Sequence, residues 1–274
     1  MQIKDLLYMA TIAAVGAGHE ILKYYEKYKS WKKEDNSPLT SADLAANDKI
    51  FEILNATGIE ICSEEKIIPF DKRKNLNEFW VVDPLDGTKE FIKKNGEFCV
   101  CIALLQNLKP VLGVIFSPIK QEIIYGANEV GIFFEKVSYD FKPKFLPLIQ
   151  EKTENFKIFL SQNIDLNAKK LLLEKFKCSF VSLSSALKFI KMCKNEVQIY
   201  ARFKGSYWWD ICAGDALLKI CGGKIIDLDT KKEICYNGKN LKNANFIAIT
   251  QNETLNKILW DNIDEFCKIS HFNN

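Results

Sequence analysis

The segment that most constrains this chain is the run Phe79-Trp80-Val81-Val82-Asp83-Pro84-Leu85-Asp86-Gly87-Thr88. Its four apolar residues, two of them β-branched, predict a short buried strand. Proline has no N–H for a sheet ladder and fixes its own φ, so we expect the strand to stop at Pro84 and to leave Asp83 at its end. Asp86 follows three residues later, across a tight turn.

The turn after this strand offers a set of oxygen donors. Gly87 lets the backbone approach a ligand closely, and Thr88 adds a hydroxyl that can cap a helix and orient a water. Two carboxylates, a backbone carbonyl between them and a hydroxyl are the ligands that hard cations such as Mg²⁺ prefer. An Asp-Gly turn can also be an ordinary solvated turn, but its position directly after an apolar strand favours a metal site.

Length and charge narrow the classes of function. A chain of 274 residues can bury a sizeable core and fits one large or two small domains. Its formal net charge of +3 is too small to indicate a nucleic-acid surface, so we expect no nucleic-acid polymer as partner. The two histidines, His19 and His271, lie far in sequence from the other motifs, which argues against catalysis based on histidine.

The cysteines and the N-terminus bear on location. Nine cysteines, an odd number without a C-x-x-C pair, indicate free buried thiols in a reducing cytosol. The apolar run from Leu6 to Gly18 resembles the core of a signal peptide. However, Asp5 precedes it, the pattern continues as a helix to Tyr25, and the run is too short to span a bilayer. We therefore expect a packed helix over 3–28 and no transmembrane segment.

The first half of the chain reads as a helical pair followed by strands. Ser41 can cap a second helix, with Leu44, Phe51 and Leu54 on one packed face. A strand over 59–63 runs into Ser63-Glu64-Glu65, and a charged loop covers 66–78. Four further strands are expected after the central motif, the first two forming an antiparallel hairpin: 98–105, 111–116, 122–126 and 131–135.

The second half alternates strands and helices, as in an α/β domain. The polar stretch 136–155 holds two prolines and predicts a boundary, which divides the chain into domains 1–140 and 141–274. Gly222-Gly223 follows the helix from Asp210 to Cys221, where a left-handed cap is wanted. The expected strands are 156–160, 179–182, 197–200, 224–227 and 245–249, and the other helices are 165–176, 184–194 and one from 253.

Four acidic residues then fall at the ends of predicted elements: Glu64, Asp83, Asp86 and Asp210. Asp210 follows Trp208-Trp209 and begins a helix, where a partial positive charge favours an anion. Each of them alone has a structural explanation, either as a loop charge or as a helix cap. Their combination is what indicates a metal site.

These residues resemble the three signatures of the inositol monophosphatase superfamily, whose members are Mg²⁺-dependent and Li⁺-sensitive phosphomonoesterases. The matching segments are Glu64-Glu65, Asp83-Pro84-Leu85-Asp86-Gly87-Thr88 and Trp209-Asp210-x-x-Ala213-Gly214. Within that superfamily the chain resembles the 3′(2′),5′-bisphosphate nucleotidases of the CysQ type. That closer resemblance rests on residues 35–43, Asp-Asn-Ser-Pro-Leu-Thr-Ser-Ala-Asp, and 87–98, Gly-Thr-Lys-Glu-Phe-Ile-Lys-Lys-Asn-Gly-Glu-Phe.

The resemblance covers the chain from the first helix to about residue 250 and is weak in 66–78 and 136–155. It departs from the family in one motif, which usually begins with Gly and here reads Ser182-Leu183-Ser184-Ser185-Ala186-Leu187-Lys188. The resemblance implies a layered αβαβα sandwich of two α/β subdomains. It also implies a cytoplasmic enzyme, monomeric or homodimeric, that is free or peripheral on the inner face of the cell membrane.

The resemblance also implies roles for the site residues. Two or three Mg²⁺ would be bound by Glu64, Asp83, the carbonyl of Leu85, Asp86 and Asp210. Asp43 and Thr88 would orient and deprotonate the attacking water. The residues implied to contact substrate are Glu64, Leu85, Asp86, Gly87, Thr88, Ser184, Ser185, Lys188 and Asp210. Arg202, one of only two arginines, follows the strand 197–200 and is a further candidate. A serine that only caps the helix and a solvated Lys188 are the alternatives.

The implied reaction is hydrolysis of adenosine 3′,5′-bisphosphate to AMP and phosphate, which would clear a by-product of sulfate assimilation. A phosphatase for inositol phosphates or another small phosphomonoester is the alternative enzyme. A protein that uses the acidic turn as a structural Ca²⁺ or Mg²⁺ site is the alternative outside catalysis. The pair of Asp43 and Thr88 argues against it, because a structural site has no use for a water activator.

Overall fold

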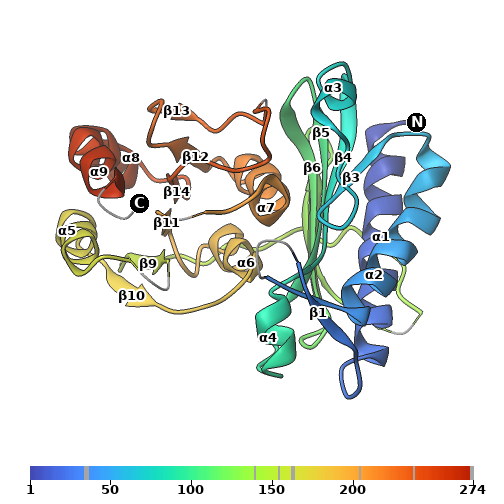
Figure 1. Cartoon of the computed structure of the whole chain (residues 1–274). Helices are drawn as coiled ribbons and strands as arrows, with labels where there is room; N and C mark the ends of the chain where they lie inside the picture. Colours follow the sequence, from blue (N-terminus) through green and yellow to red (C-terminus); the bar gives the residue numbers. More distant parts are fainter. Residues whose placement is uncertain are drawn as a thin grey trace.

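The computed structural model describes residues 1–33, 37–138, 140–153, 155–161, 164–203, 205–236 and 238–271. Two six-stranded sheets dominate it, each built from a different half of the chain. Helices cover the outer face of each sheet and fill the space between them (Figure 1). This order of layers confirms the predicted αβαβα sandwich.

The first sheet is largely antiparallel, with only β3 and β4 paired in parallel. In spatial order it contains β3 (Ile61–Ser63), β4 (Glu78–Asp86), β5 (Cys99–Gln106), β6 (Lys109–Ser117), β7 (Glu122–Ala127) and β8 (Gly131–Lys136). The predicted hairpin is β5 and β6, joined through Asn107 and Leu108, which both have positive φ. A separate small ribbon pairs β1 (Ser30–Lys32) with β2 (Pro38–Thr40).

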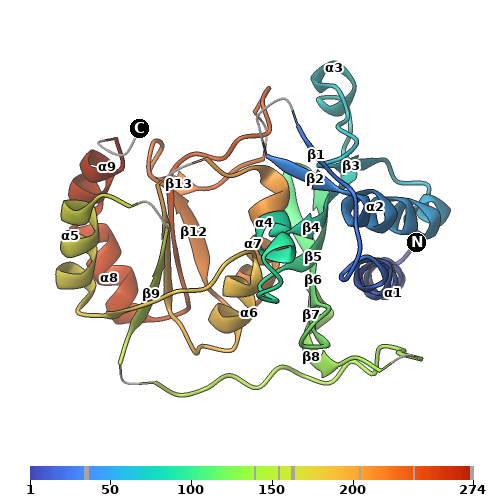
Figure 2. The same ribbon diagram turned by 60° about the horizontal axis from the view of Figure 1, so that its bottom comes forward.

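The second sheet mixes parallel and antiparallel pairs. Its spatial order is β10 (Ser179–Val181), β9 (Lys157–Leu160), β11 (Ile199–Arg202), β14 (Phe246–Ile249), β12 (Lys224–Asp227) and β13 (Lys232–Glu233). A long extended connection runs from β8 to β9, along the side of the molecule (Figure 2). It contains the polar stretch that we predict to be a domain boundary, and the division at residue 140 stays a prediction.

The helices form three layers around the two sheets (Figure 1). The outer layer on the first sheet is α1 (Ile3–Lys23) and α2 (Ser41–Leu54). The middle layer is α6 (Leu187–Cys193) and α7 (Trp208–Ile220). The outer layer on the second sheet is α5 (Leu166–Phe176), α8 (Glu253–Asp261) and α9 (Ile263–His271). Short helical turns complete the chain: η1 (Asn55–Thr57), α3 (Phe70–Arg73) and α4 (Thr88–Ile92).

The central strand β4 shows why its sequence is a continuous apolar run. Phe79 and Val81 pack into the core between the first sheet and α7, whereas Trp80 and Val82 pack under α1 and α2. A strand buried on both faces needs apolar residues at consecutive positions. The predicted stop at Pro84 is wrong, because β4 continues to Asp86 through a shift in register between Asp83 and Asp86. Such a bulge accommodates the missing N–H of proline.

Several predicted helix boundaries also need correction. The first helix ends at Lys23 rather than near residue 28. The cap of α2 is Thr40 and not Ser41, and Leu44 is 40% exposed and therefore not part of the packed face. The segment 66–78 contains the short helix α3, and the last predicted helix is two helices, α8 and α9. Within the described residues, no helix is long and apolar enough to cross a membrane.

Helix α7 belongs to the second half of the chain and packs directly against the first sheet. A Cβ at Gly113 in β6 would lie 2.3 Å from the carbonyl oxygen of Ala213 in α7, so only glycine permits this close approach. The predicted left-handed cap of this helix is confirmed at Gly222, which has a φ of +79°. The close approach at Gly113 holds α7 directly against β6 of the first sheet.

Candidate active site

Three aspartates from two elements converge where β4 ends and α7 begins. One carboxylate oxygen each from Asp83, Asp86 and Asp210 lie within 4.8 Å of one another. The bulge in β4 brings Asp83 and Asp86 together, and the backbone N–H of Leu85 donates to Asp83 Oδ1 at 3.0 Å. Asp210 is the third residue of α7, rather than its first, and accepts from the N–H of Tyr207 at 2.7 Å.

Burial and mutual repulsion make these carboxylates hard to ionise. Burial raises the pKa of Asp83 well above its ordinary value, and the carboxylates of Glu64, Asp86 and Asp210 add to the effect. Burial also raises the pKa of Asp86 to about 6 and that of Asp210 to about 7. A cation would relieve the repulsion among these three acids, and their all-oxygen donor set fits a hard divalent ion.

Glu64 approaches the same cluster from the neighbouring strand. It follows the last residue of β3, and its backbone N–H donates to the carbonyl of Val82 in β4 at 3.0 Å. Its carboxylate accepts from Lys33 Nζ at 2.6 Å, and the same ammonium lies 2.7 Å from Glu65. Lys33 therefore places a positive charge beside the acidic cluster, a contact that sequence reasoning missed because the two residues lie 31 positions apart.

Asp43 and Thr88 meet on the other side of the β4 bulge. The Thr88 hydroxyl lies 3.0 Å from Asp43 Oδ1 and 3.3 Å from the carbonyl oxygen of Leu85. Asp43 Oδ2 accepts from the backbone N–H of Thr40 at 2.7 Å, which closes the capping box of α2. Burial raises the pKa of Asp43, although hydrogen bonds from Thr40 and Thr88 oppose that shift. The pairing expected from the sequence is therefore present as a hydrogen bond.

The expected helix cap at Thr88 is wrong by one position. Gly87 is the cap of α4, and Thr88 is its first residue, so the threonine side chain is free to point to Asp43. Gly87 has a φ of +98°, and a Cβ there would lie 3.0 Å from the carbonyl oxygen of Glu97. Both facts require glycine at this turn.

A cavity of about 310 Å³ opens beside Asp86 and Asp210. It is lined by the predicted substrate residues Ser184, Ser185, Lys188 and Arg202, and also by Gly87. Lys188 is only 6% exposed, and its ammonium donates to the carbonyl of Ser185 at 3.0 Å. The second half of the chain therefore brings two cations to the carboxylates of the first half.

The serine segment differs from its predicted form. Helix α6 begins at Leu187, so Ser184 and Ser185 precede it, and Ser185 has a positive φ of 55°. Their contacts come from the first half of the chain instead. The N–H of Ser184 donates to Glu97 at 2.9 Å, and the N–H of Ala186 donates to Asp86. This segment therefore rests directly on the acidic strand end.

Tyr200 is a cavity residue that the sequence analysis did not select. Its hydroxyl accepts from Arg202 at 3.3 Å, and Lys188 Nζ lies 5.3 Å from the centre of its ring, close enough for a cation–π contact. Tyr200 and Arg202 are alternate residues of β11, so they share one face of the strand. That alternation was the available signal, because it groups Tyr200 with the predicted Arg202.

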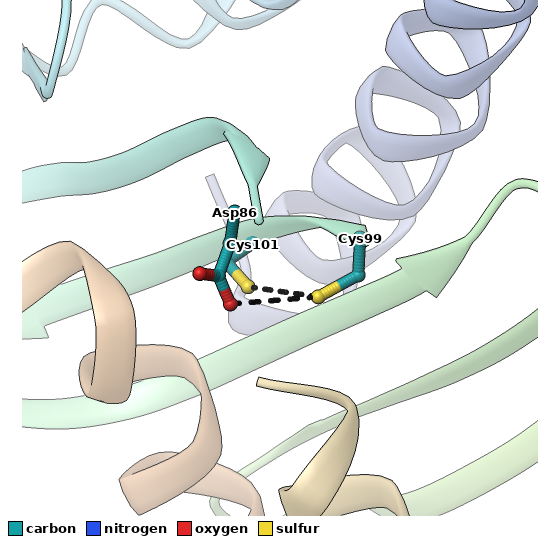
Figure 3. A group of neighbouring side chains, drawn as sticks. All are labelled: Asp86, Cys99 and Cys101. Carbon is teal, nitrogen blue, oxygen red and sulfur yellow. Dashed lines mark hydrogen bonds between the residues drawn. The ribbon is translucent and has the colours of Figure 1, made fainter. Parts of the chain in front are cut away.

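Two buried thiols, Cys99 and Cys101, lie beside Asp86 (Figure 3). Cys99 pairs with Asp86 and Cys101 pairs with Asp83 across the β4–β5 ladder. The sulfur of Cys99 lies 3.7 Å from Asp86 Oδ2 and 3.8 Å from the sulfur of Cys101. From the sequence, both residues were expected only to be free buried thiols.

One predicted segment is described only in part: Asp35 and Asn36, the first two residues of the motif 35–43, lie outside the described residues.

The fold and this arrangement of carboxylates agree with a comparison to known families. The model of the inositol monophosphatase family matches residues 3–264, and the chain belongs to that family.

Several curated relatives have the name 3′(2′),5′-bisphosphate nucleotidase CysQ. The one from Buchnera aphidicola is 38% identical over 77% of this chain and 80% of its own length. The one from Escherichia coli K12 is 34% identical over 80% of this chain and 89% of its own length.

Solved structures extend the comparison to three dimensions. CysQ from Bacteroides thetaiotaomicron, described as a bacterial member of the inositol monophosphatase family, is 32% identical and has a TM-score of 0.78. It covers 90% of this chain and 97% of its own. An IMPase from Thermotoga maritima, at 19% identity and a TM-score of 0.74 over 98% of this chain and all of its own, shares the fold.

Proposed function

We propose that this chain is a Mg²⁺-dependent phosphomonoesterase that hydrolyses adenosine 3′,5′-bisphosphate to AMP and phosphate. The observation that carries the proposal is the position of three converging carboxylates beside a cavity that also holds Lys188 and Arg202. The carboxylates suit metal-assisted attack on one phosphate, and the cations suit a second phosphate. The names of the CysQ relatives support this substrate.

The metal ligands in this proposal are Glu64, Asp83, the carbonyl of Leu85, Asp86 and Asp210, which would hold two or three Mg²⁺. Bound Mg²⁺ supplies Lewis-acid polarisation of the phosphate and makes a bound water more acidic. Asp83 and Asp86 contribute most of the negative charge from the first sheet, and Asp210 completes the set from α7. Removing any of these carboxylates weakens the affinity of the site for a hard cation.

Asp43 and Thr88 are the proposed water activators. The Thr88 hydroxyl donates to Asp43 Oδ1, so its oxygen lone pairs are directed to accept a hydrogen bond from water. The proton of the water would pass to the Thr88 oxygen while the Thr88 proton passes to Asp43, and the raised pKa of the buried Asp43 carboxyl suits it to that task. The capping box fixes Asp43 from behind, so its position does not depend on substrate.

The phosphate to be cleaved would lie at the turn that begins α4. The backbone N–H groups of Gly87 and Thr88 would donate to its oxygens, as such groups do at helix beginnings. Glu64, Leu85, Asp86, Thr88 and Asp210 would contact it together with the metal.

The second phosphate and the nucleoside would occupy the cavity lined by the second half of the chain. Lys188 and Arg202 supply positive charge, and Ser184 and Ser185 supply hydroxyl groups. In this proposal the domain 1–140 carries most of the metal ligands and the water activators, and the domain 141–274 carries Asp210 and the contacts to the rest of the substrate. We further propose a cytoplasmic protein that acts as a monomer or homodimer.

The test is phosphate release from a panel of substrates with Mg²⁺. The panel contains adenosine 3′,5′-bisphosphate, adenosine 2′,5′-bisphosphate, inositol 1-phosphate and fructose 1,6-bisphosphate. The proposal expects the adenosine bisphosphates to have the highest kcat/KM. A clear preference for inositol 1-phosphate would instead assign the chain to the inositol phosphatases.

A further inference from the structure

The thiols of Cys99 and Cys101 and the carboxylate of Asp86 form a compact three-donor group, in which one atom of each lies within 4.8 Å of the others (Figure 3). Both cysteines are at most 1% exposed. They are alternate residues of β5 and therefore share one face of the strand. None of the roles proposed above uses either thiol.

The spacing of these donors matches the geometry of a tetrahedral soft-metal site. Zn–S bonds of about 2.3 Å at tetrahedral angles place two sulfurs about 3.8 Å apart, and a Zn–O bond of about 2.0 Å places oxygen and sulfur about 3.5 Å apart. The sulfurs here are 3.8 Å apart, and Asp86 Oδ2 is 3.7 Å from Cys99 Sγ. The donors therefore need little movement to share one ion.

The chemistry of the donors separates this site from the Mg²⁺ site. Thiolates prefer soft or borderline cations such as Zn²⁺ and Cd²⁺, whereas Mg²⁺ prefers oxygen. The hydroxyl oxygen of Ser185 lies 3.7 Å from Cys99 Sγ. Asp86 and Ser185 both line the substrate cavity, so the thiols lie directly behind its wall.

We infer that Asp86, Cys99 and Cys101 form a binding site for a thiophilic divalent cation such as Zn²⁺ or Cd²⁺. An ion bound there competes with Mg²⁺ for the charge of Asp86, because Asp86 belongs to both donor sets. An ion at this site therefore antagonises Mg²⁺. The binding itself is independent of the proposed function, and only its inhibitory effect rests on that function.

Titration with Cd²⁺ in the absence of Mg²⁺ tests the binding, which is followed by the ultraviolet absorption that cadmium–thiolate bonds produce. The double variant Cys99→Ser/Cys101→Ser should lose the absorption that the unaltered chain shows. The matched control is Cys193→Ser/Cys221→Ser, which removes another pair of hydrogen-bonded thiols. This control should keep the signal of the unaltered chain. Equal titrations for both double variants would overturn the inference.

A second measurement needs no variant and so does not depend on whether the altered chains fold. Cadmium-113 NMR of the unaltered protein should show a resonance in the region of mixed sulfur and oxygen ligands. Resonances only from all-oxygen coordination would rule out the site.

Phosphate release in the presence of Mg²⁺ tests the antagonism. Loss of a metal ligand should raise the Zn²⁺ concentration for half-inhibition by at least ~10-fold in Cys99→Ser, since loss of outer partners alone weakens metal binding 10–100-fold. Unchanged sensitivity in a variant that has lost Cd²⁺ binding would refute the competition for Asp86. A chain without phosphatase activity would contradict the proposed function, and the Cd²⁺ titration would still test the site.

Discussion

Asp86 contacts both the other metal-site aspartates and the serine segment that lines the cavity. It is the last residue of β4, it shares the acidic cluster with Asp83 and Asp210, and its carboxylate accepts from the N–H of Ala186. The substrate segment and the metal cluster are thereby joined through one side chain. At the scale of single residues, the roles of such side chains can be separated by substitutions that change charge, hydroxyl or length alone.

Asp83→Asn should abolish most of the Mg²⁺-dependent turnover while leaving the fold intact. The amide keeps the shape of the side chain but loses the charge that binds a hard cation. We expect kcat to fall by more than ~100-fold, because loss of outer partners alone costs 10–100-fold. Asp71→Asn, at a side chain 89% exposed, is the control. Near-normal turnover of Asp83→Asn at saturating Mg²⁺ would show that this residue is not a metal ligand.

Thr88→Ala should lower kcat by about 10²–10⁴-fold, the usual cost of losing general-base assistance. The hydroxyl contacts Asp43 rather than the cluster of three aspartates, so the apparent affinity for Mg²⁺ should change far less. Thr88→Ser keeps the hydroxyl and should restore most of the rate. Steady-state kinetics of both variants provide the check, and an effect confined to KM would exclude the proposed role.

At the scale of elements, the sequence predicted the helices and strands whose positions depend on neighbouring residues in the chain. The strand before Asp83, the hairpin after it and the helix after Asp210 were expected and are present as β4, β5 with β6, and α7. The continuation of β4 past Pro84 was not predictable, because it depends on how β5 pairs with both sides of the bulge. The late beginning of α6 has a similar cause, since Ser184 and Ala186 donate to acidic residues of the other half.

The same limit applied to the contacts within the site. The carboxylates could be chosen because each follows a recognisable element end. Lys33 and the thiol pair carry no such local mark, and only the folded chain brings them to the cluster. Side-chain type and spacing therefore indicated the metal chemistry, whereas the surroundings of the metal site required the tertiary structure.

The metal-free protein should lose stability as the pH rises from about 4 to about 7. Burial raises the pKa of Asp86 from 3.8 to about 6 and that of Asp210 to about 7. The folded chain therefore holds protons that the unfolded chain releases near pH 4, and the stability from this difference is lost as the pH passes the folded pKa values. Melting temperatures in a chelator, measured from pH 4 to pH 8, provide the check.

Asp210→Asn is the control for this pH dependence, because it removes the titrating carboxyl of α7 and leaves Asp86 of β4 in place. It should flatten the upper part of the profile, and Mg²⁺ should stabilise the unaltered protein most above pH 7. A profile that is the same in both proteins would mean that burial of Asp210 does not govern stability in this range.

At the scale of the whole molecule, the site lies where the two halves of the sandwich meet (Figure 1). The first sheet provides Asp83 and Asp86, and the second half provides Asp210, Lys188 and Arg202. In the proposed function, the metal cluster would contact only the phosphate that is cleaved. Preference for a nucleotide must therefore come from the cavity residues of the second half.

Lys188→Ala should raise KM for adenosine 3′,5′-bisphosphate much more than KM for adenosine 3′-monophosphate, which lacks the second phosphate. Binding made equally in the ground and transition states appears in KM, and a hydrogen bond to a charged group contributes about 1.5–3 kcal/mol. Lys191→Ala is the control, because Lys191 lies on the same helix and its ammonium pairs with Glu196. Equal losses on both substrates would transfer the role to Arg202.

The most direct test of the account is a competition between two substrates in one reaction. Adenosine 3′,5′-bisphosphate and inositol 1-phosphate are mixed at equal concentrations with Mg²⁺, and the consumption of each is followed by phosphorus NMR. The ratio of rates equals the ratio of kcat/KM, and we predict at least ~10-fold faster loss of the nucleotide, with AMP as product. Equal consumption, a preference for inositol 1-phosphate, or a reaction that proceeds without Mg²⁺ would contradict the account.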